Sequence, residues 1–314
     1  MAYYLGIDGG GSKTTCTVGD ESALVAMVAA GPSNITRVGE VRARESLHHA
    51  IREACAAAKI APHQLQRTCV GIAGAGREEI ADAVRKIVAE LIPGEIEVVG
   101  DMQIALAAAF GAGPGVIVIA GTGSIAYGRA AQGRTARAGG WGFAISDEGS
   151  AHWIGRAAVS GVLRAIDERI DAEKNAELTA DTSLLFREMK TIWNLRSLDE
   201  FVRNANSNPH FAALLPAIVV AAHGADALAQ RVLTQAGAEL AQLAGIVVRR
   251  LFRKDDVGLP KVPLAMVGGV FRHSTTVREV FCQEVRQLDA RLEVNSHVVE
   301  PVAGALQMAR QANR

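Results

Sequence analysis

The first residues able to do chemistry form a short glycine turn near the amino terminus. An apolar run ends at Asp8, three glycines and Ser12-Lys13-Thr14 follow, and a second β-prone run begins at once. This order predicts a strand, a tight turn and a second strand. Glycines let main-chain N–H groups approach an anion closely, so the turn suits a nucleotide phosphate. The residues predicted to bind phosphate here are Gly9, Gly10, Gly11, Ser12, Lys13 and Thr14.

Asp8 lies where the first strand meets this turn. A carboxylate there can hold Mg²⁺ beside the phosphates, because Mg²⁺ prefers oxygen ligands and keeps several of its waters. A glycine hairpin in which Asp8 only caps the turn fits the same residues. A Walker loop is excluded, since no Gly-Lys-Ser/Thr follows at the required distance and a strand comes next.

A similar pattern recurs in the middle of the chain. The apolar strand expected at residues 115–120 leads into Gly121-Thr122-Gly123-Ser124, and a further β run follows at residues 125–129. Two such turns in matching contexts indicate an internal duplication. We therefore expect a domain boundary near residue 117 and a second set of phosphate donors at Gly121, Thr122, Gly123 and Ser124.

Asp101 is the candidate catalytic residue. A short strand expected at residues 96–99 runs into Gly100-Asp101, and a helix is expected at residues 102–110. A carboxylate at the end of a strand in an open α/β sheet can take the proton of a substrate hydroxyl that attacks a γ-phosphate. Asp is also a favoured helix N-cap, and position alone leaves both interpretations open.

Three further segments could bind ligands. Gly139-Gly140-Trp141-Gly142 precedes Asp147-Glu148-Gly149-Ser150, and an indole beside carboxylates is typical of carbohydrate subsites. The acidic residues also fit the first turn of a helix expected at residues 151–170. Asn34 suits a sugar hydroxyl or an ordinary turn. Gly268-Gly269 follows a strand expected to be the last one, at residues 262–267, where glycines admit an adenine or simply allow a turn.

Composition limits the class of protein. The 314 residues are 49% hydrophobic, and 33 basic residues balance 33 acidic ones, which argues against nucleic acid or an acidic membrane as the main partner. The cysteines, Cys16, Cys55, Cys69 and Cys282, have no metal-binding spacing and indicate reduced thiols in a cytoplasm. The chain begins directly in a strand, and its apolar stretches are shorter than the roughly 20 residues that span a bilayer.

The motifs in this order resemble those of the N-acetylglucosamine kinase branch, grouped with the BadF/BadG activator ATPases, of the actin, sugar-kinase and heat-shock ATPase superfamily. The most specific are Asp-Gly-Gly-Gly-Ser-Lys-Thr, Gly-Thr-Gly-Ser and Gly-Gly-Trp-Gly before Asp-Glu-Gly-Ser. The resemblance implies a two-domain α/β fold of the ribonuclease H-like type, with duplicated βββαβα lobes at residues 1–117 and 118–314 and a cleft between them. The second lobe would contain a helical insertion, with the final helix there or packed back on the first lobe.

The resemblance also implies an ATP- and Mg²⁺-dependent phosphorylation, at the 6-hydroxyl of N-acetylglucosamine or glucosamine, in a cytoplasmic homodimer. Asp101 would be the base and Asp8 the metal ligand, Gly268 and Gly269 would bind adenosine, and the sugar would be held by Asn34, Asp101, Gly140, Trp141 and Asp147. Ile125 departs from the Asn of animal N-acetylglucosamine kinases, which leaves the preferred amino sugar open. The alternatives are an activator ATPase for a radical dehydratase or benzoyl-CoA reductase, and a non-catalytic ATP-driven switch.

Overall fold

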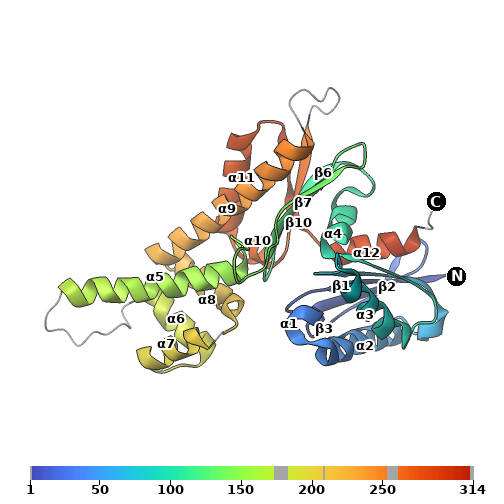
Figure 1. Ribbon diagram of the computed structural model, residues 1–314, viewed down its shortest axis with the longest axis horizontal. Helices are drawn as coiled ribbons and strands as arrows, with labels where there is room; N and C mark the ends of the chain where they lie inside the picture. Colours follow the sequence, from blue (N-terminus) through green and yellow to red (C-terminus); the bar gives the residue numbers. More distant parts are fainter. Residues whose placement is uncertain (1, 173–182, 208, 253–260, 312–314) are drawn as a thin grey trace. The chain divides into compact units, whose positions relative to one another are not determined.

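The computed structural model describes residues 2–172, 183–207, 209–252 and 261–311 (Figure 1). The chain divides into two compact units, one of Met1–Ile117 with Val299–Arg314 and one of Val118–Val298. The last helix therefore groups with the first unit, although it follows the second unit in the sequence.

The first unit is a five-stranded sheet with helices on both faces. Its strands have the order β3-β2-β1-β4-β5, in which β1 pairs antiparallel with β2 and parallel with β4, and β4 pairs parallel with β5. Its elements are β1 (Tyr3–Gly9), β2 (Thr14–Gly19), β3 (Leu24–Ala30), α1 (Ile35–Val38), α2 (Glu40–Ala57), η1 (Pro62–Gln64), β4 (Leu65–Ile72), α3 (Glu78–Ala89), β5 (Glu95–Gly100), α4 (Asp101–Phe110) and α12 (Pro301–Arg310).

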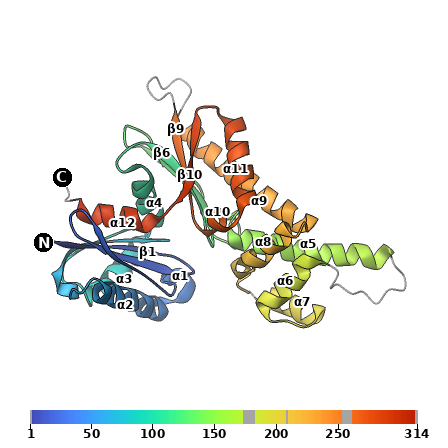
Figure 2. The ribbon, with the colours of Figure 1, turned by 180° about the vertical axis from the view of Figure 1, so that it is seen from behind.

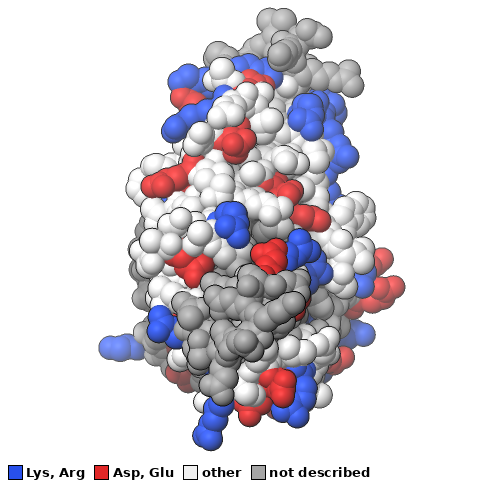
Figure 3. All heavy atoms as spheres, turned by 90° about the vertical axis from the view of Figure 1, so that its left-hand side faces the viewer, with Lys and Arg blue, Asp and Glu red and all other residues white. Residues whose placement is uncertain are grey.

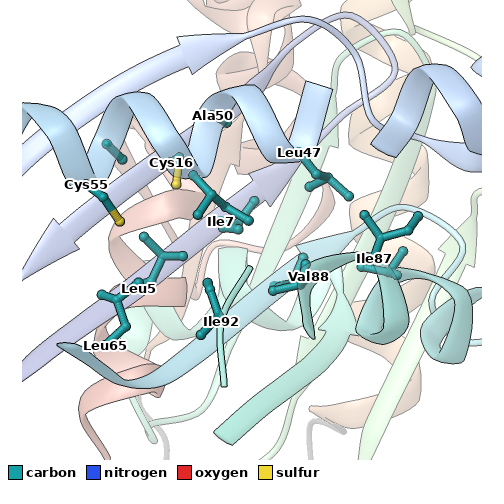
Figure 4. Close-up of a cluster of buried hydrophobic side chains, with 14 of the residues drawn as sticks. Leu5, Ile7, Cys16, Leu47, Ala50, Cys55, Leu65, Ile87, Val88 and Ile92 are labelled. Atoms are coloured by element: carbon teal, nitrogen blue, oxygen red, sulfur yellow. The ribbon is translucent and has the colours of Figure 1, made fainter. Parts of the chain in front are cut away.

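Two apolar layers hold this sheet in place. On one face, α2 and α3 cover a cluster that includes Leu5, Ile7, Leu47 and Val88 (Figure 4). On the other face, α4 and α12 pack against the sheet, as both views of the ribbon show (Figure 1, Figure 2). Alternate side chains of a strand point to opposite faces, so strands covered on both faces read as the continuous apolar runs seen in the sequence.

The second unit contains another five-stranded sheet, with the order β10-β9-β6-β7-β8. Its elements are β6 (Gly115–Ala120), β7 (Ser124–Arg129), β8 (Thr135–Gly139), α5 (Ala151–Ala172), α6 (Leu184–Trp193), α7 (Leu198–Asn206), η3 (Phe211–Leu214), α8 (Leu215–His223), α9 (Ala227–Leu251), β9 (Val262–Val267), α10 (Gly269–His273), α11 (Thr275–Leu288) and β10 (Leu292–Val299). The boundary between the units falls within β6.

The two sheets repeat one topology. The second sheet, read from β8 to β10, has the same strand order as the first sheet read from β3 to β5. Thus β6, β7, β8, β9 and β10 correspond to β1, β2, β3, β4 and β5. Each repeat has its glycine turn between its first two strands, at residues 10–13 and 121–123. The α/β class and the internal duplication predicted from the two glycine turns are confirmed.

Two strands were not predicted. Residues 262–267 were expected to form the last strand, but β10 follows, and half of its side chains are polar and exposed. β8 lies in the glycine-rich stretch at residues 133–142, and it is specified by its pairing with β7. Both strands form because of a neighbour in the sheet, which the local pattern of apolar residues does not report.

The surface charges and the apolar helices bear on two expectations drawn from the composition. Basic and acidic side chains are interspersed on the face shown in Figure 3. Within the described residues, no single helix is long and apolar enough to cross a membrane, and one bent pair, Phe211–His223 with Ala227–Leu251, meets the criteria of length and composition together.

Candidate functional site

Asp8 and Asp101 lie at the same edge of the first sheet. Gly9 pairs with Ile72, and Ile72 pairs with Gly100 on the next parallel strand. Gly9, Ile72 and Gly100 thus lie side by side on three neighbouring strands. Asp8 comes directly before Gly9 in the chain, and Asp101 comes directly after Gly100. Adjacent strands are about 4.8 Å apart, so the two backbones are roughly 10 Å apart with β4 between them.

Asp101 is not the N-cap of its helix. Gly100 occupies the N-cap position of α4, and its N–H donates to Gln103 Oε1 at 2.9 Å. Asp101 is the first helical residue, and its carboxylate accepts the N–H of Met102 at 2.9 Å. The capping interpretation of Asp101 is therefore wrong, because glycine and Gln103 perform that task. Burial raises the pKa of the Asp101 carboxyl above its ordinary value, which favours proton uptake.

The first glycine turn is fixed through Gly10. The N–H of Gly10 donates to Lys13 O at 2.9 Å, and its carbonyl accepts the N–H groups of Ser33 and Asn34 at 3.2 and 3.3 Å. The described residues contain no cis peptide, and in a trans peptide the C=O and the next N–H point in opposite directions. The N–H of Gly11 therefore points away from the segment that holds Asn34, as an anion donor should.

Thr14 has a structural task within this turn. Its side chain is fully buried, and its Oγ1 lies 2.7 Å from Gly31 O and 2.7 Å from Ser33 Oγ. Gly9 is also buried, and a Cβ there would meet Ser33 Oγ at 2.6 Å. Among the residues predicted to bind phosphate, the exposed ones are Ser12 and Lys13 at the tip, whereas Thr14 and Gly9 shape the turn from beneath.

Asn34 caps the short helix α1. Its Oδ1 accepts the N–H of Thr36 at 3.1 Å and the Thr36 hydroxyl at 2.6 Å. The turn-forming interpretation is correct for this oxygen. The amide Nδ2 takes no part in these bonds, so the cap also holds a donor in a fixed orientation, as a sugar-binding role requires.

The second glycine turn is held by the start of α5. The N–H of Ala151 donates to Gly121 O at 2.9 Å, and that of His152 donates to Thr122 O at 3.4 Å. Gly121 N–H donates to Gly123 O at 2.9 Å. As in the first turn, carbonyls are held on one side, which directs the intervening N–H groups to the other.

Asp147 joins this turn to the loop that contains Trp141. Asp147 is buried and has a backbone φ of +66°, which is uncommon for a residue other than glycine. Its carboxylate accepts N–H groups from Gly142, at 3.3 Å, and from Ser124. Burial raises the pKa of this carboxyl, and the two N–H donors partly offset that effect. Asp147 was predicted to touch sugar, and in the structure it fixes two loops of the second unit.

Trp141 is displayed by a loop of unusual backbone. Gly139, Gly140 and Gly142 have φ of +73°, +69° and +103°, and a Cβ on Gly140 would meet Ile125 at 2.7 Å. The indole is 66% exposed, and the Arg137 guanidinium lies 4.5 Å from the ring centre. Arg137 was not singled out in the sequence, and its guanidinium is attracted to the face of the exposed indole.

His152 is a second residue that the sequence did not indicate. Its ring lies 4.8 Å from that of Phe143 and 5.3 Å from that of Phe211, measured between centroids. The first turn of α5 therefore anchors both the glycine turn and the loop after Trp141. A histidine flanked by aromatic residues distant in sequence gives no local signal.

Gly268 packs against the second glycine turn. It has φ +102°, and a Cβ there would come within 2.4 Å of Ala120 O. Close backbone packing therefore requires glycine at this position, independently of a nucleotide. Gly269 begins α10 in more open surroundings, where the nearest atom to a Cβ is 3.8 Å away.

The residues present fit a magnesium ion that is bound mainly by phosphate oxygens and waters and by few protein side chains. No group of three or more His, Cys, Asp or Glu side chains in the described ranges could form a protein cage for a metal. Mg²⁺ is commonly bound by one or two carboxylates together with phosphate oxygens and waters. Asp8, partly exposed at the end of β1, offers such a carboxylate.

Comparisons with known proteins find relatives over nearly the whole chain. An N-acetylmuramic acid/N-acetylglucosamine kinase of Clostridium acetobutylicum is 31% identical, with 99% of each chain covered. An N-acetyl-D-glucosamine kinase of Dictyostelium discoideum is 26% identical, over 99% of this chain and 98% of that one. A solved structure from Chromobacterium violaceum, of a candidate N-acetylglucosamine kinase, has a TM-score of 0.74 at 24% identity and covers 99% of both chains.

The structural match confirms the predicted fold class. The family model that matches is that of the BadF/BadG/BcrA/BcrD ATPases, over residues 5–309. This range takes in all the motifs on which the resemblance was based. The chain therefore belongs to the BadF/BadG/BcrA/BcrD ATPase family.

Proposed function

We propose that the protein is an ATP-dependent amino-sugar kinase that phosphorylates the 6-hydroxyl of N-acetylglucosamine or glucosamine. The observation that carries this proposal is the placement of Asp8 and Asp101 at one sheet edge, with the first glycine turn beside Asp8. The similarity to kinases of N-acetylated amino sugars over 99% of the chain supports it.

Asp101 acts as the general base in this proposal. Its carboxylate accepts the proton of the sugar hydroxyl while that oxygen bonds to the γ-phosphorus of ATP and the bond from phosphorus to the ADP oxygen breaks. The products are the sugar phosphate and ADP, and the proton leaves Asp101 to solvent. The raised pKa of this carboxyl brings it closer to that of a useful base at neutral pH.

The glycine turns and Asp8 bind the nucleotide. The proposed donors to the phosphates are the N–H of Gly11, the exposed Ser12 and Lys13, and the backbone at residues 121–124. Mg²⁺, when bound, would neutralise charge on the phosphate oxygens, and Asp8 would hold it. Gly268 and Gly269 are the proposed adenosine contacts.

The proposed sugar contacts are Asn34, Asp101, Gly140, Trp141 and Asp147. Trp141 offers a flat apolar surface, and Asn34 offers a fixed amide. The Clostridium relative is also named for N-acetylmuramic acid, so that sugar belongs among the candidate substrates. On this proposal the enzyme is a cytoplasmic homodimer, as the family resemblance implies.

An activator ATPase has less support. Such proteins use paired cysteines to bridge an iron–sulfur cluster between subunits. Here Cys16, Cys55 and Cys69 are buried in the first unit, and Cys282 lies on α11 of the second. Buried thiols are poorly placed to share a cluster with another subunit.

A panel assay tests the kinase proposal. ADP release would be measured with ATP, Mg²⁺ and one sugar at a time, using N-acetylglucosamine, glucosamine, N-acetylmuramic acid, N-acetylmannosamine and glucose. We expect an amino sugar to stimulate ADP release far above the rate without sugar. A rate that no sugar changes would instead favour the non-catalytic switch.

A further inference from the structure

We propose that Thr14 and Ser33 are positioning residues that couple nucleotide binding at the first glycine turn to sugar binding at Asn34. This inference rests on the proposed function, since it assigns the two ligands to these segments. It concerns the first unit alone, in which both segments lie.

The contact between Thr14 and Ser33 is a buried chain of hydroxyl groups. Both side chains are fully buried, and Thr14 Oγ1 is 2.7 Å from Gly31 O and from Ser33 Oγ. A hydroxyl carries one proton and a carbonyl only accepts, so Thr14 donates to Gly31 and Ser33 donates to Thr14. The strand that leaves the glycine turn is thereby tied to the segment that leads to Asn34.

The backbone completes the connection. Ser33 and Asn34 each donate an N–H to Gly10 O, which orients the peptide between Gly10 and Gly11. The N–H of Gly11 is the phosphate donor on the other side of that peptide. A shift of Asn34 towards a sugar therefore moves Gly10 O, and a phosphate that fixes Gly11 restrains Asn34.

Such a connection has a thermodynamic consequence. If one ligand orders the segment that the other also needs, the second ligand binds more tightly, and the effect is reciprocal. The buried hydroxyls limit how far the two segments can move apart. Removing them should leave each ligand able to bind, but with affinities that depend less on each other.

Calorimetry on the full chain measures this coupling. The Kd of N-acetylglucosamine would be determined with and without saturating Mg²⁺ and AMPPNP, a non-hydrolysable ATP analogue, and the ratio gives the coupling factor. We expect about fivefold or more for the unaltered protein. Thr14→Val removes the hydroxyl at nearly constant shape and should bring the factor within about twofold of one.

The controls separate coupling from general damage. Thr14→Ser retains the hydroxyl and should keep the coupling factor. Thr17→Val removes another buried hydroxyl of β2, which donates to Gly6 O at 3.2 Å, away from the turn, and should also keep it. If Thr14→Val does not fold in a thermal unfolding scan, Ser33→Ala, which leaves the bond to Gly31 intact, takes its place and should lower the factor likewise.

The outcomes distinguish this proposal from the proposed function. Binding of AMPPNP and sugar with a coupling factor near one in the unaltered protein would overturn the coupling and leave the kinase assignment intact. A factor that Thr14→Val or Ser33→Ala leaves unchanged would show that these hydroxyls have no part in it. If the unaltered protein binds neither AMPPNP nor any sugar of the panel, the proposed function fails and this inference fails with it.

Discussion

Asp147 places a carboxylate oxygen 2.6 Å from the position that a Cβ atom at Gly123 would occupy. The second glycine turn is thus packed directly against the residue that holds the Trp141 loop. The contact explains why glycine is needed at 123 even without a ligand, and it distinguishes Gly123 from Gly121, where a Cβ would meet nothing within 4 Å.

Gly123→Ala and Gly121→Ala should therefore have different effects. The first displaces Asp147 and should lower the free energy of unfolding by about 1–3 kcal/mol, a usual cost of overpacking. The second should change it by no more than about 0.5 kcal/mol and instead raise the KM for ATP, because the methyl group meets only the ligand. Urea unfolding and ADP-release kinetics check the pair, and equal stabilities would contradict this account of Gly123.

Asp101→Asn should abolish turnover and leave sugar binding largely intact. The amide keeps the shape and can still accept the N–H of Met102, but it cannot take up the proton of the sugar hydroxyl. Glu300→Gln is the matched control, since Glu300 is at the junction of β10 and α12 as Asp101 is at the junction of β5 and α4, and it should retain activity. Substantial turnover by Asp101→Asn, measured as ADP release, would remove Asp101 from its catalytic role.

The Asp101 carboxyl also makes the stability of the unaltered protein depend on pH in a defined direction, and Asp101→Asn removes that dependence. Burial raises the pKa of Asp101 in the folded protein, so the unfolded chain loses this proton first as pH rises from the ordinary value of 3.8. Over that window the folded state binds more protons, and this group lowers the free energy of unfolding as pH increases. Asp101→Asn should therefore be more stable than the unaltered protein at neutral pH.

That difference should disappear below the ordinary pKa of Asp, where both states are protonated. Asp147 also has a raised pKa, but it is present in both proteins and cancels in the comparison. Urea unfolding at several pH values checks the sign. A stability difference that grows as pH falls would show that the Asp101 carboxylate is stabilised, rather than desolvated, in the folded protein.

The parts of the site that are local in sequence were predictable. The glycine turns follow from residue types that alternate with β-prone runs, and the strands expected at residues 115–120 and 262–267 have those limits in the structure. The position of Asp101 after a short strand followed from the same pattern. Its place at the first position of the helix did not, because Gly100 and Gln103 perform the capping.

The parts that depend on distant residues were not predictable. Thr14 and Ser33 are 19 residues apart, and nothing in their surroundings shows that they share a buried contact. Asp147 has a left-handed backbone, and its carboxylate accepts the N–H groups of Gly142 and Ser124, which the sheet and the loop bring together.

The cysteines should be largely unreactive in the folded protein. Burial raises the pKa of Cys55 to about 11 and that of Cys69 to about 12, and it also raises those of Cys16 and Cys282. Cys282 alone among them is not fully buried. A thiol titration with Ellman's reagent should show slow labelling of Cys282 and release of the other three thiols only on unfolding, with Cys282→Ala as the control. Rapid labelling of several thiols, or bound iron, would revive the activator alternative.

Trp141→Ala should weaken sugar binding without unfolding the protein. The indole is 66% exposed, so its loss should change the free energy of unfolding by no more than about 0.5 kcal/mol. Stacking on an aromatic face is worth about 0.5–1.5 kcal/mol, which corresponds to a roughly two- to tenfold rise in the Kd of N-acetylglucosamine.

Trp193→Phe provides the opposite case. Trp193 packs between Phe201 and Phe211, with centroids at 5.2 and 5.8 Å, so a smaller ring should cost about 1 kcal/mol of stability and leave sugar affinity unchanged. Calorimetric titration and thermal unfolding of both variants separate the two roles. If Trp141→Ala binds sugar as well as the unaltered protein does, the exposed indole and its partner Arg137 lie outside the sugar site. Gly139, Gly140 and Gly142 would then serve only to hold the loop against Ile125.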